Sequence, residues 1–99
     1  SKAHLRVIHA APTVDEVNVV EKGGDKLFDG INFTSEAGFK DIDPWSGTLE
    51  FRTEDGNKLL GTLASVNLKA GVSYTIVLAT NKQGKLDSFW FEDQQLVGQ

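Results

Sequence analysis

The sequence predicts an all-β fold, an Ig-like or prealbumin-like antiparallel β-sandwich of about seven to eight strands. Three observations predict it. Turn signals rich in Gly, Asn, Asp and Pro recur along the chain, the stretches between them are short and rich in Val, Ile, Leu, Thr and Phe, and no segment has sustained helical periodicity. Because 99 residues suit one core, we expect a single domain over 1–99, with its core in 4–92 and a polar tail at 93–99 that frays.

Short apolar stretches locate the strands. We expect strands over residues 5–10, 15–21, 26–28, 48–53, 58–68, 72–79 and 86–91. In the first of them Leu5, Val7 and His9 share one face. Pro12 closes this strand because it has no amide hydrogen for a ladder. The Gly-Gly pair that follows the second strand is typical of a primed hairpin turn.

The middle of the chain is less regular. Glycines interrupt residues 31–42, and we expect this segment to bury Phe33, Phe39 and Ile42. A turn over residues 43–47 follows, since the proline at its second position presets the backbone dihedral.

The second half contains the clearest strands. Residues 48–53 alternate between apolar and polar side chains, which indicates a half-buried strand. A hairpin turn at 54–57 returns the chain into 58–68. Residues 72–79 are apolar on both faces, so we expect a central strand that is covered on both sides.

The spacing Leu68-x-x-Gly71-x-x-Tyr74 resembles the tyrosine corner of Ig-like sandwiches. In that corner the phenol hydroxyl bonds to backbone a few residues upstream. A structural role for Tyr74 is therefore favoured over a catalytic one.

Three sequence motifs resemble a bacterial cell-envelope domain family of unknown function. They are R-V-I-H-A-A-P at 6–12, V-N-V at 17–19 and L-x-x-G-x-x-Y-T-I-V at 68–77. Ala11 and Asn18 stand where that family usually has Ser and Asp. The resemblance implies a periplasmic or cell-surface location and no established activity. Since the sequence starts at Ser and lacks Met, we expect an export signal to have been removed.

Composition excludes several classes of function. The chain has no cysteine, which rules out a thiol nucleophile, an iron–sulfur cluster or a cysteine zinc site within it. Its formal net charge is −4, and its ten Lys and Arg residues are scattered instead of forming a stripe, so we expect no nucleic-acid partner. No apolar run approaches the roughly 20 residues of a membrane span.

Neither histidine predicts a catalytic site. His9 shares the inner face of its strand, so we expect a buried imidazole bonded to backbone near Pro12, a structural role. His4 lies an odd number of residues away and faces the opposite side, so the two rings cannot hold a metal together. No G-x-S-x-G motif accompanies the serines. We therefore predict no catalytic residue and no enzyme.

The acidic residues leave one alternative open. Asp41 and Asp43 share a strand face and could bind calcium weakly with Glu36 or Asp55, but the D-x-D-x-[DN]-G spacing of a calcium loop is absent. We predict no metal site and no cofactor.

The aromatic residues give the strongest functional hint. Trp45 and Trp90 could form a stacking platform for a sugar, or they could close the two ends of the core. Phe89 and Phe91 lie on the last strand, an expected sheet edge, which predicts an edge-strand homodimer.

These features together predict a non-enzymatic cell-envelope or secreted module that binds or has a structural role, with a protein or glycan partner at the cell surface. The alternative is a carbohydrate-binding module that uses Trp45 and Trp90.

Overall fold

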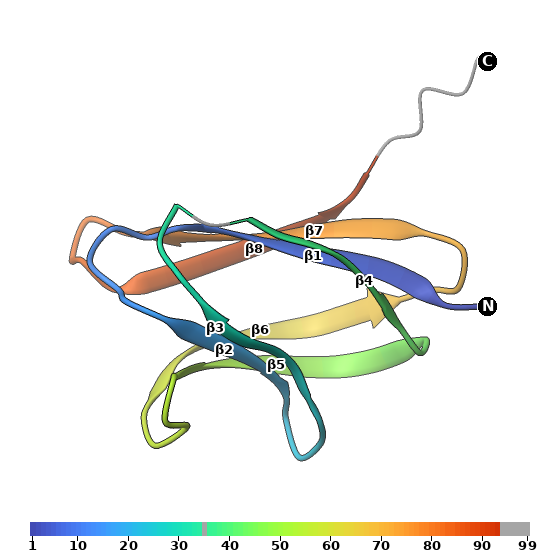
Figure 1. Ribbon diagram of the computed structural model, residues 1–99, viewed down its shortest axis with the longest axis horizontal. Helices are drawn as coiled ribbons and strands as arrows, with labels where there is room; N and C mark the ends of the chain where they lie inside the picture. The colour runs from blue at the N-terminus through green and yellow to red at the C-terminus, as the bar shows by residue number, and fades with distance from the viewer. Residues whose placement is uncertain (35, 94–99) are drawn as a thin grey trace.

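The computed structural model of the chain describes residues 1–34 and 36–93, which form eight strands and no helix. The strands are β1 (Ala3–Ala10), β2 (Val17–Glu21), β3 (Lys26–Ile31), β4 (Glu36–Ile42), β5 (Trp45–Thr53), β6 (Leu59–Leu68), β7 (Ser73–Thr80) and β8 (Leu86–Glu92). They form two sheets that lie face to face (Figure 1). The predicted all-β sandwich is confirmed. Of the tail expected to fray, 93–99, residues 94–99 lie outside the described residues, whereas the Asp93 N–H donates to the Ser73 carbonyl at 2.8 Å.

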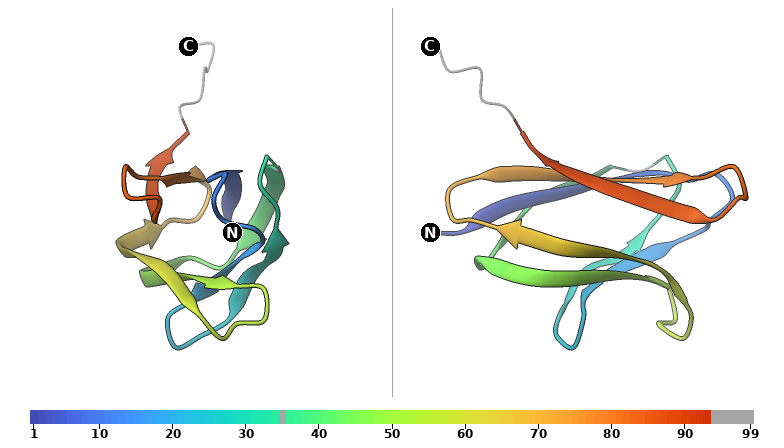
Figure 2. Two further views of the ribbon diagram at one scale, coloured as in Figure 1. Left: turned by 90° about the vertical axis from the view of Figure 1, so that its left-hand side faces the viewer. Right: turned by 180° about the vertical axis from the view of Figure 1, so that it is seen from behind.

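Each sheet has four strands, in the orders β4-β1-β7-β8 and β3-β2-β5-β6. Figure 2 shows the two layers from the end and from behind. The antiparallel prediction holds for every strand pair except β1 with β7, which run parallel, with Leu5 opposite Tyr74. A parallel pair needs a long crossover connection. Here the second sheet and β4 supply that connection.

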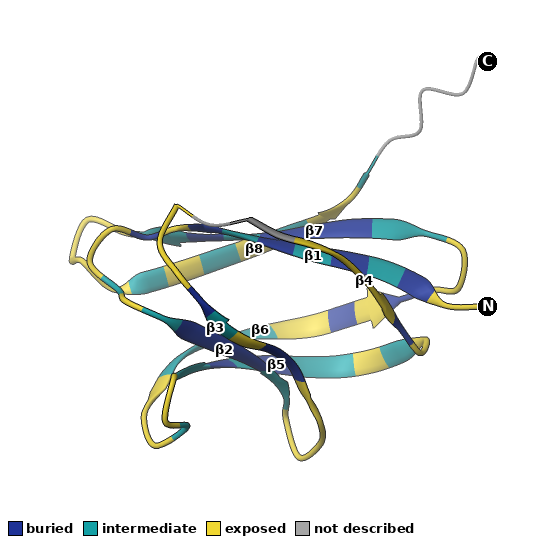
Figure 3. Cartoon of the chain, viewed as in Figure 1, coloured by how far each residue is buried: buried dark blue, intermediate teal, exposed yellow. Residues whose placement is uncertain are grey.

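The core lies between the sheets and is built from alternate residues of the central strands. Side chains with less than 2% exposure include Leu5, Val7, Val17, Val19, Leu49, Phe51, Ile76 and Leu78. Along β1, Figure 3 shows buried positions alternating with intermediate ones. Because side chains of a strand alternate in direction, the period of two that is visible in the sequence places one face of each strand inside.

Two of the three side chains that we expected residues 31–42 to bury are exposed. Ile42 is buried, whereas Phe33 and Phe39 are 42% and 49% exposed. Phe39 and Ile42 are an odd number of residues apart on β4, so they cannot share a face. Phe39 lies on the outer face of its sheet instead, where the Arg6 guanidinium stacks 4.9 Å from its ring centre.

The turn predicted at residues 43–47 is shorter in the structure. β5 already begins at Trp45, so only residues 43 and 44 lie between strands. No helix in the part of the chain that the structure describes is long and apolar enough to cross a membrane.

Candidate functional site

An open cleft lies among the β1–β2, β3–β4 and β5–β6 connections. These three connections lie on the left-hand side of the ribbon in Figure 1. Its volume is about 860 Å³. All three connections contribute to its lining, which consists of Thr13, Val14, Asp15, Glu16, Asn32, Phe33, Thr53, Glu54, Asp55 and Leu60. The surface therefore combines apolar side chains with four carboxylates.

His9 holds the first of these connections. The ring is buried, with 1% exposure, and its Nε2 lies 2.7 Å from the Asp15 carbonyl oxygen. Its Nδ1 lies 3.2 Å from the Ala11 backbone nitrogen. A backbone carbonyl can only accept and a backbone N–H can only donate, so the ring is the neutral tautomer with the proton on Nε2. Both ring nitrogens are thus used to fix the β1–β2 connection.

Phe33 lies beside this histidine. The two rings meet edge to face, with centroids 6.0 Å apart and planes at 76°. The Thr34 N–H also donates to the His9 carbonyl at 2.9 Å, which ties the β3–β4 connection to the end of β1. Phe33 therefore contacts His9 on one side, while the residue is 42% exposed and lines the cleft.

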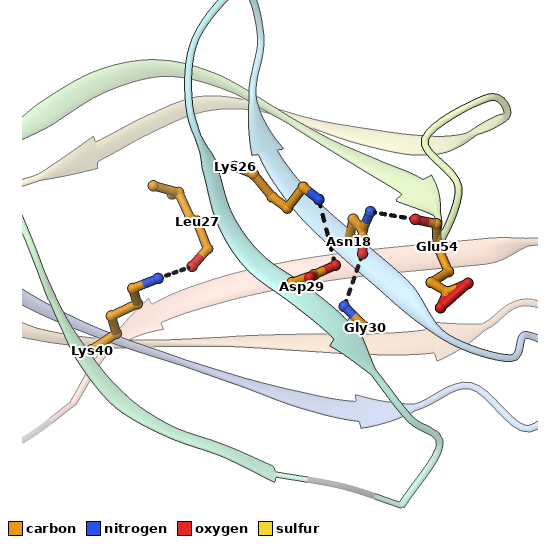
Figure 4. A network of polar contacts seen from close by, with 7 residues as sticks. All are labelled: Asn18, Lys26, Leu27, Asp29, Gly30, Lys40 and Glu54. Carbon is orange, nitrogen blue, oxygen red and sulfur yellow. Dashed lines mark hydrogen bonds and ion pairs between the residues drawn. The ribbon is translucent and has the colours of Figure 1, made fainter.

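Asn18 joins the β5–β6 connection, the third that lines the cleft, to strand β2, as Figure 4 shows. Its side-chain amide nitrogen donates to the Glu54 carbonyl at 3.0 Å, and its amide oxygen accepts the Gly30 N–H at 2.8 Å. Asn18 is buried with 1% exposure. A single side chain on β2 thus holds the start of the β5–β6 turn and a residue of β3.

The carboxylates of the cleft interact with one another. The negative charge of Glu54, together with a hydrogen bond between the two carboxyl groups, raises the pKa of Glu16 above its ordinary value. Asp29 and Asp15 add to this effect. Like charges at short distance favour a proton on one of them. The cleft is therefore a place where added negative charge is disfavoured and a cation is favoured.

Asp55 has the opposite environment. Its carboxylate accepts a hydrogen bond from the Thr53 hydroxyl at 2.6 Å and another from the Asn57 N–H at 2.9 Å. These bonds lower the pKa of Asp55. The residue closes the β5–β6 turn and stays ionised at neutral pH.

Trp45 and Trp90 do not line the cleft. Trp45 is half-buried at the start of β5, and Trp90 is half-buried on β8 in the other sheet. Both pack against the core. The Trp90 ring lies 5.5 Å from the Tyr74 ring at a tilt of 43°. Tyr74 is buried, and its hydroxyl accepts the Lys69 N–H at 2.9 Å, five residues upstream.

The acidic pair Asp41 and Asp43 makes ion pairs at the other end of the molecule. The Asp41 carboxylate lies 2.6 Å from His4 Nδ1, and Asp43 pairs with Lys2, which lowers the pKa of Asp43 through a hydrogen bond and its positive charge. Asp55 lies in the β5–β6 turn, so the structure does not bring it to this pair. Among the described residues, no group of three His, Asp or Glu side chains is placed to hold a metal ion.

The arrangement is suited to binding. Within residues 1–34 and 36–93 the hydrogen bonds of the two histidine rings go to Asp41, the Asp15 carbonyl and the Ala11 N–H. What the cleft offers is a concave, partly apolar surface with negative charge.

Sequence reasoning missed Glu16, Glu54 and Phe33 as neighbours. They come from three connections that are far apart in the chain, and no local spacing links them. The available signal was weak: Glu54-Asp55 falls in an expected turn, whereas Asp15-Glu16 opens a segment that was expected to be a strand.

Comparisons with known proteins agree with the fold. The family model described as a domain of unknown function (DUF4397) matches residues 3–98. The solved C-terminal domain of AlgF from P. aeruginosa is similar in structure, with a TM-score of 0.72 and 22% sequence identity over 93% of this chain and 98% of that one. No curated protein matches the sequence significantly. The family match supports the predicted resemblance to a domain family of unknown function. The cell-envelope location stays a prediction.

Proposed function

The chain belongs to the DUF4397 family, a domain of unknown function, and we propose that it acts as a binding module, not as an enzyme, through the cleft that Phe33 and four carboxylates line. The observation that carries the proposal is the composition of this concave surface. Val14, Phe33 and Leu60 give it apolar contact area, and its carboxylates give it one sign of charge. Binding sites combine these two elements, since apolar contact provides affinity and charge provides orientation.

The ligand that fits this chemistry is a segment of a partner protein that carries Lys or Arg beside an apolar side chain. A cation between Glu16 and Glu54 removes the repulsion that raises the pKa of Glu16. Phe33 is exposed at the cleft and supplies a ring face for the stem of the basic side chain or for its apolar neighbour.

The proposed place of action is the periplasm or the cell surface, which rests on the family resemblance of the sequence motifs. Absence of cysteine is compatible with any compartment. The carbohydrate-binding alternative needs Trp45 and Trp90 to offer ring faces to a sugar. Both rings pack against the core, so this alternative has less support than the cleft.

A binding experiment tests the proposal. The probes are a labelled short peptide with Lys beside Leu and a matched peptide with Glu in place of Lys, and fluorescence anisotropy gives the dissociation constants. We expect the basic peptide to bind and the acidic one not to bind. Phe33→Ser should weaken binding at least about fivefold, and Glu54→Gln roughly two- to fivefold, with a smaller salt dependence.

Two control variants make the same kinds of substitution outside the cleft. Phe39→Ser removes another exposed phenylalanine, and Asp87→Asn removes another exposed carboxylate, both outside the cleft. Neither should change the affinity. Equal affinity for the two peptides, or turnover of a generic ester, phosphate or glycoside that is lost on changing His9, would lead us to abandon the proposal. Glycan binding that Trp90→Ala removes would replace it with the carbohydrate alternative.

A further inference from the structure

Four strands lie at the edges of the two sheets: β4 and β8 in one, β3 and β6 in the other. Natural edges avoid pairing with other chains through bulges, inward-pointing charges and strand distortion. The edges of this molecule differ in how far they use these devices.

Three edges carry such protection. The pairing of β3 with β2 shifts register twice, and Gly30 on β3 has a φ of 68°. On β4 the pairing with β1 shifts register once, and Lys40 turns toward the neighbouring sheet, where its ammonium donates to the Leu27 carbonyl at 2.6 Å (Figure 4). On β6 the pairing with β5 shifts twice, and Ser65 has a φ of 60°.

The β8 edge is regular. Its pairing with β7 runs from Tyr74 opposite Glu92 to Thr80 opposite Leu86 with no register shift. Phe89 and Phe91 are 51% and 47% exposed on the outer face of this strand. Figure 3 shows the alternation of exposed and less exposed positions along β8. A regular edge with two exposed aromatic rings is a template for another strand.

The direction of the backbone groups on β8 follows from one hydrogen bond. The Asp93 N–H donates to the Ser73 carbonyl at 2.8 Å, so the pair of these two residues is bonded across the ladder. In an antiparallel ladder bonded and non-bonded pairs alternate. Odd-numbered residues of β8 therefore bond to β7, and Ser88 and Trp90 direct their backbone groups outward. The Ser88 N–H accordingly donates to the side chain of its neighbour Asp87, at 3.0 Å.

We propose that two copies of this chain pair through β8 in antiparallel orientation, with Phe89 opposite Phe89 of the second copy. In this register Ser88 faces the second Trp90, and these two residues exchange the central backbone hydrogen bonds. The Leu86 end lies close to β6, where a methyl group on Gly61 would be 3.7 Å from the Leu86 carbonyl. The backbone pairing is therefore centred on Ser88–Trp90.

Charge selects this register over its neighbours. With Phe89 at the centre, Lys85 of each copy lies opposite Asp93 of the other, which gives two ion pairs on the outer face. Moving the centre to Trp90 places Asp87 opposite Asp93, two carboxylates that repel. Moving it to Ser88 separates Lys85 from Asp93 and puts no aromatic ring opposite another. Only the register centred on Phe89 joins opposite charges and an aromatic pair.

The experiment is sedimentation equilibrium of the chain from micromolar to millimolar concentration. We expect a reversible monomer–dimer equilibrium that Phe89→Ser abolishes. Lys85→Glu should weaken the dimer roughly 2- to 30-fold, since it removes two exposed ion pairs. Asp93→Lys should weaken it similarly, and the double variant Lys85→Glu with Asp93→Lys should restore the affinity to within about threefold of the original.

Lys82→Glu is the matched control, because it makes the same change of net charge in the same turn without facing Asp93. It should leave the dimer unchanged. Asp93 also accepts a hydrogen bond from the Thr75 hydroxyl at 2.8 Å, so thermal melting should show that each variant is folded, and Lys85→Glu tests the pair without touching that bond. A chain that stays monomeric at millimolar concentration overturns the proposal. A dimer that responds equally to Lys85→Glu and Lys82→Glu, or that the double variant does not restore, overturns the register.

Discussion

The buried imidazole of His9 bonds the carbonyl oxygen of Asp15 at 2.7 Å, across the connection that leaves β1. The same ring accepts the Ala11 N–H and contacts Phe33 edge to face. One core side chain therefore fixes two of the three walls of the cleft. These bonds give the histidine a structural role on an otherwise apolar strand face.

Replacing His9 with Phe should destabilise the fold. The new ring keeps most of the volume but leaves the Asp15 carbonyl and the Ala11 N–H without partners. We expect a loss of about 2–4 kcal/mol in the free energy of unfolding, measured by urea denaturation. His4→Phe on the same strand is the control and should cost no more than about 1 kcal/mol, since its partner Asp41 is exposed. Similar losses for both variants would contradict the role of His9.

Asn18→Asp should also destabilise the protein. The substitution removes the donor that bonds the Glu54 carbonyl and places a carboxylate beside that oxygen in a buried position. We expect a cost of about 1–3 kcal/mol. Asn67→Asp is the control, because Asn67 is exposed and accepts its hydrogen bond from the Ser46 hydroxyl through an oxygen that Asp retains. An unchanged stability of Asn18→Asp at neutral pH would refute the proposed network.

The Glu16–Glu54 pair should make stability depend on pH. The raised pKa of Glu16 means that the folded state binds this proton more tightly than the unfolded chain. The contribution of this group to stability therefore increases as pH falls through the folded pKa, and it is complete below the ordinary value near 4.5. Glu54→Gln should return the pKa of Glu16 toward that value. A carboxyl NMR titration measures it, and an unchanged Glu16 titration would disprove the coupling.

Asp43 and Asp55 should act in the opposite sense. Their pKa values are lowered, by Lys2 in one case and by Thr53 and Asn57 in the other. The stability that they provide is present above their ordinary values and is lost as pH falls through the folded ones. Asp55→Asn should therefore reduce the loss of stability in acid, and acid unfolding followed by circular dichroism tests this expectation.

Gly47 should be intolerant of a side chain. Its φ is 157°, and a methyl group there would lie 2.8 Å from Trp45 Cζ2. Gly47→Ala must move the Trp45 ring, so we expect a cost of about 1–3 kcal/mol and a red-shifted tryptophan emission. Gly38→Ala is the control because nothing lies within 4 Å of the added methyl. It should change stability by no more than about 0.5 kcal/mol.

Tyr74→Phe removes one hydrogen bond and little else. The Lys69 N–H then has no phenol oxygen to bond. We expect a loss of about 1–2 kcal/mol in thermal or urea unfolding with the fold retained. A variant as stable as the parent protein would show that this corner adds nothing to stability.

The sequence predicted the sandwich and most of its strands because alternation is a local signal. Leu49 and Phe51 are two residues apart on β5 and both are buried, as the period of two requires. The parallel pairing of β1 with β7 could not be predicted, since it joins residues such as Leu5 and Tyr74 that are far apart in the chain. Phe39 is exposed because it lies an odd number of residues from the buried Ile42 on β4, and Phe33 is exposed because it lies in the β3–β4 connection.

The cleft could not be predicted for the same reason. Glu16, Phe33 and Glu54 become neighbours only after the sheets form, and no motif spacing carries that information. The backbone contacts of His9, in contrast, are close in sequence, and its inner-face position beside Pro12 was visible in the alternation of β1.

The most direct test of the binding proposal is a map of backbone amide NMR shifts during titration with the basic Lys–Leu peptide. Binding in the cleft predicts shifts that saturate together and are concentrated at residues 13–16, 32–33 and 53–60, with little change around Trp45 and Trp90. Saturating shifts on the outer face of β8 or at the two tryptophans, with the cleft unaffected, would contradict it.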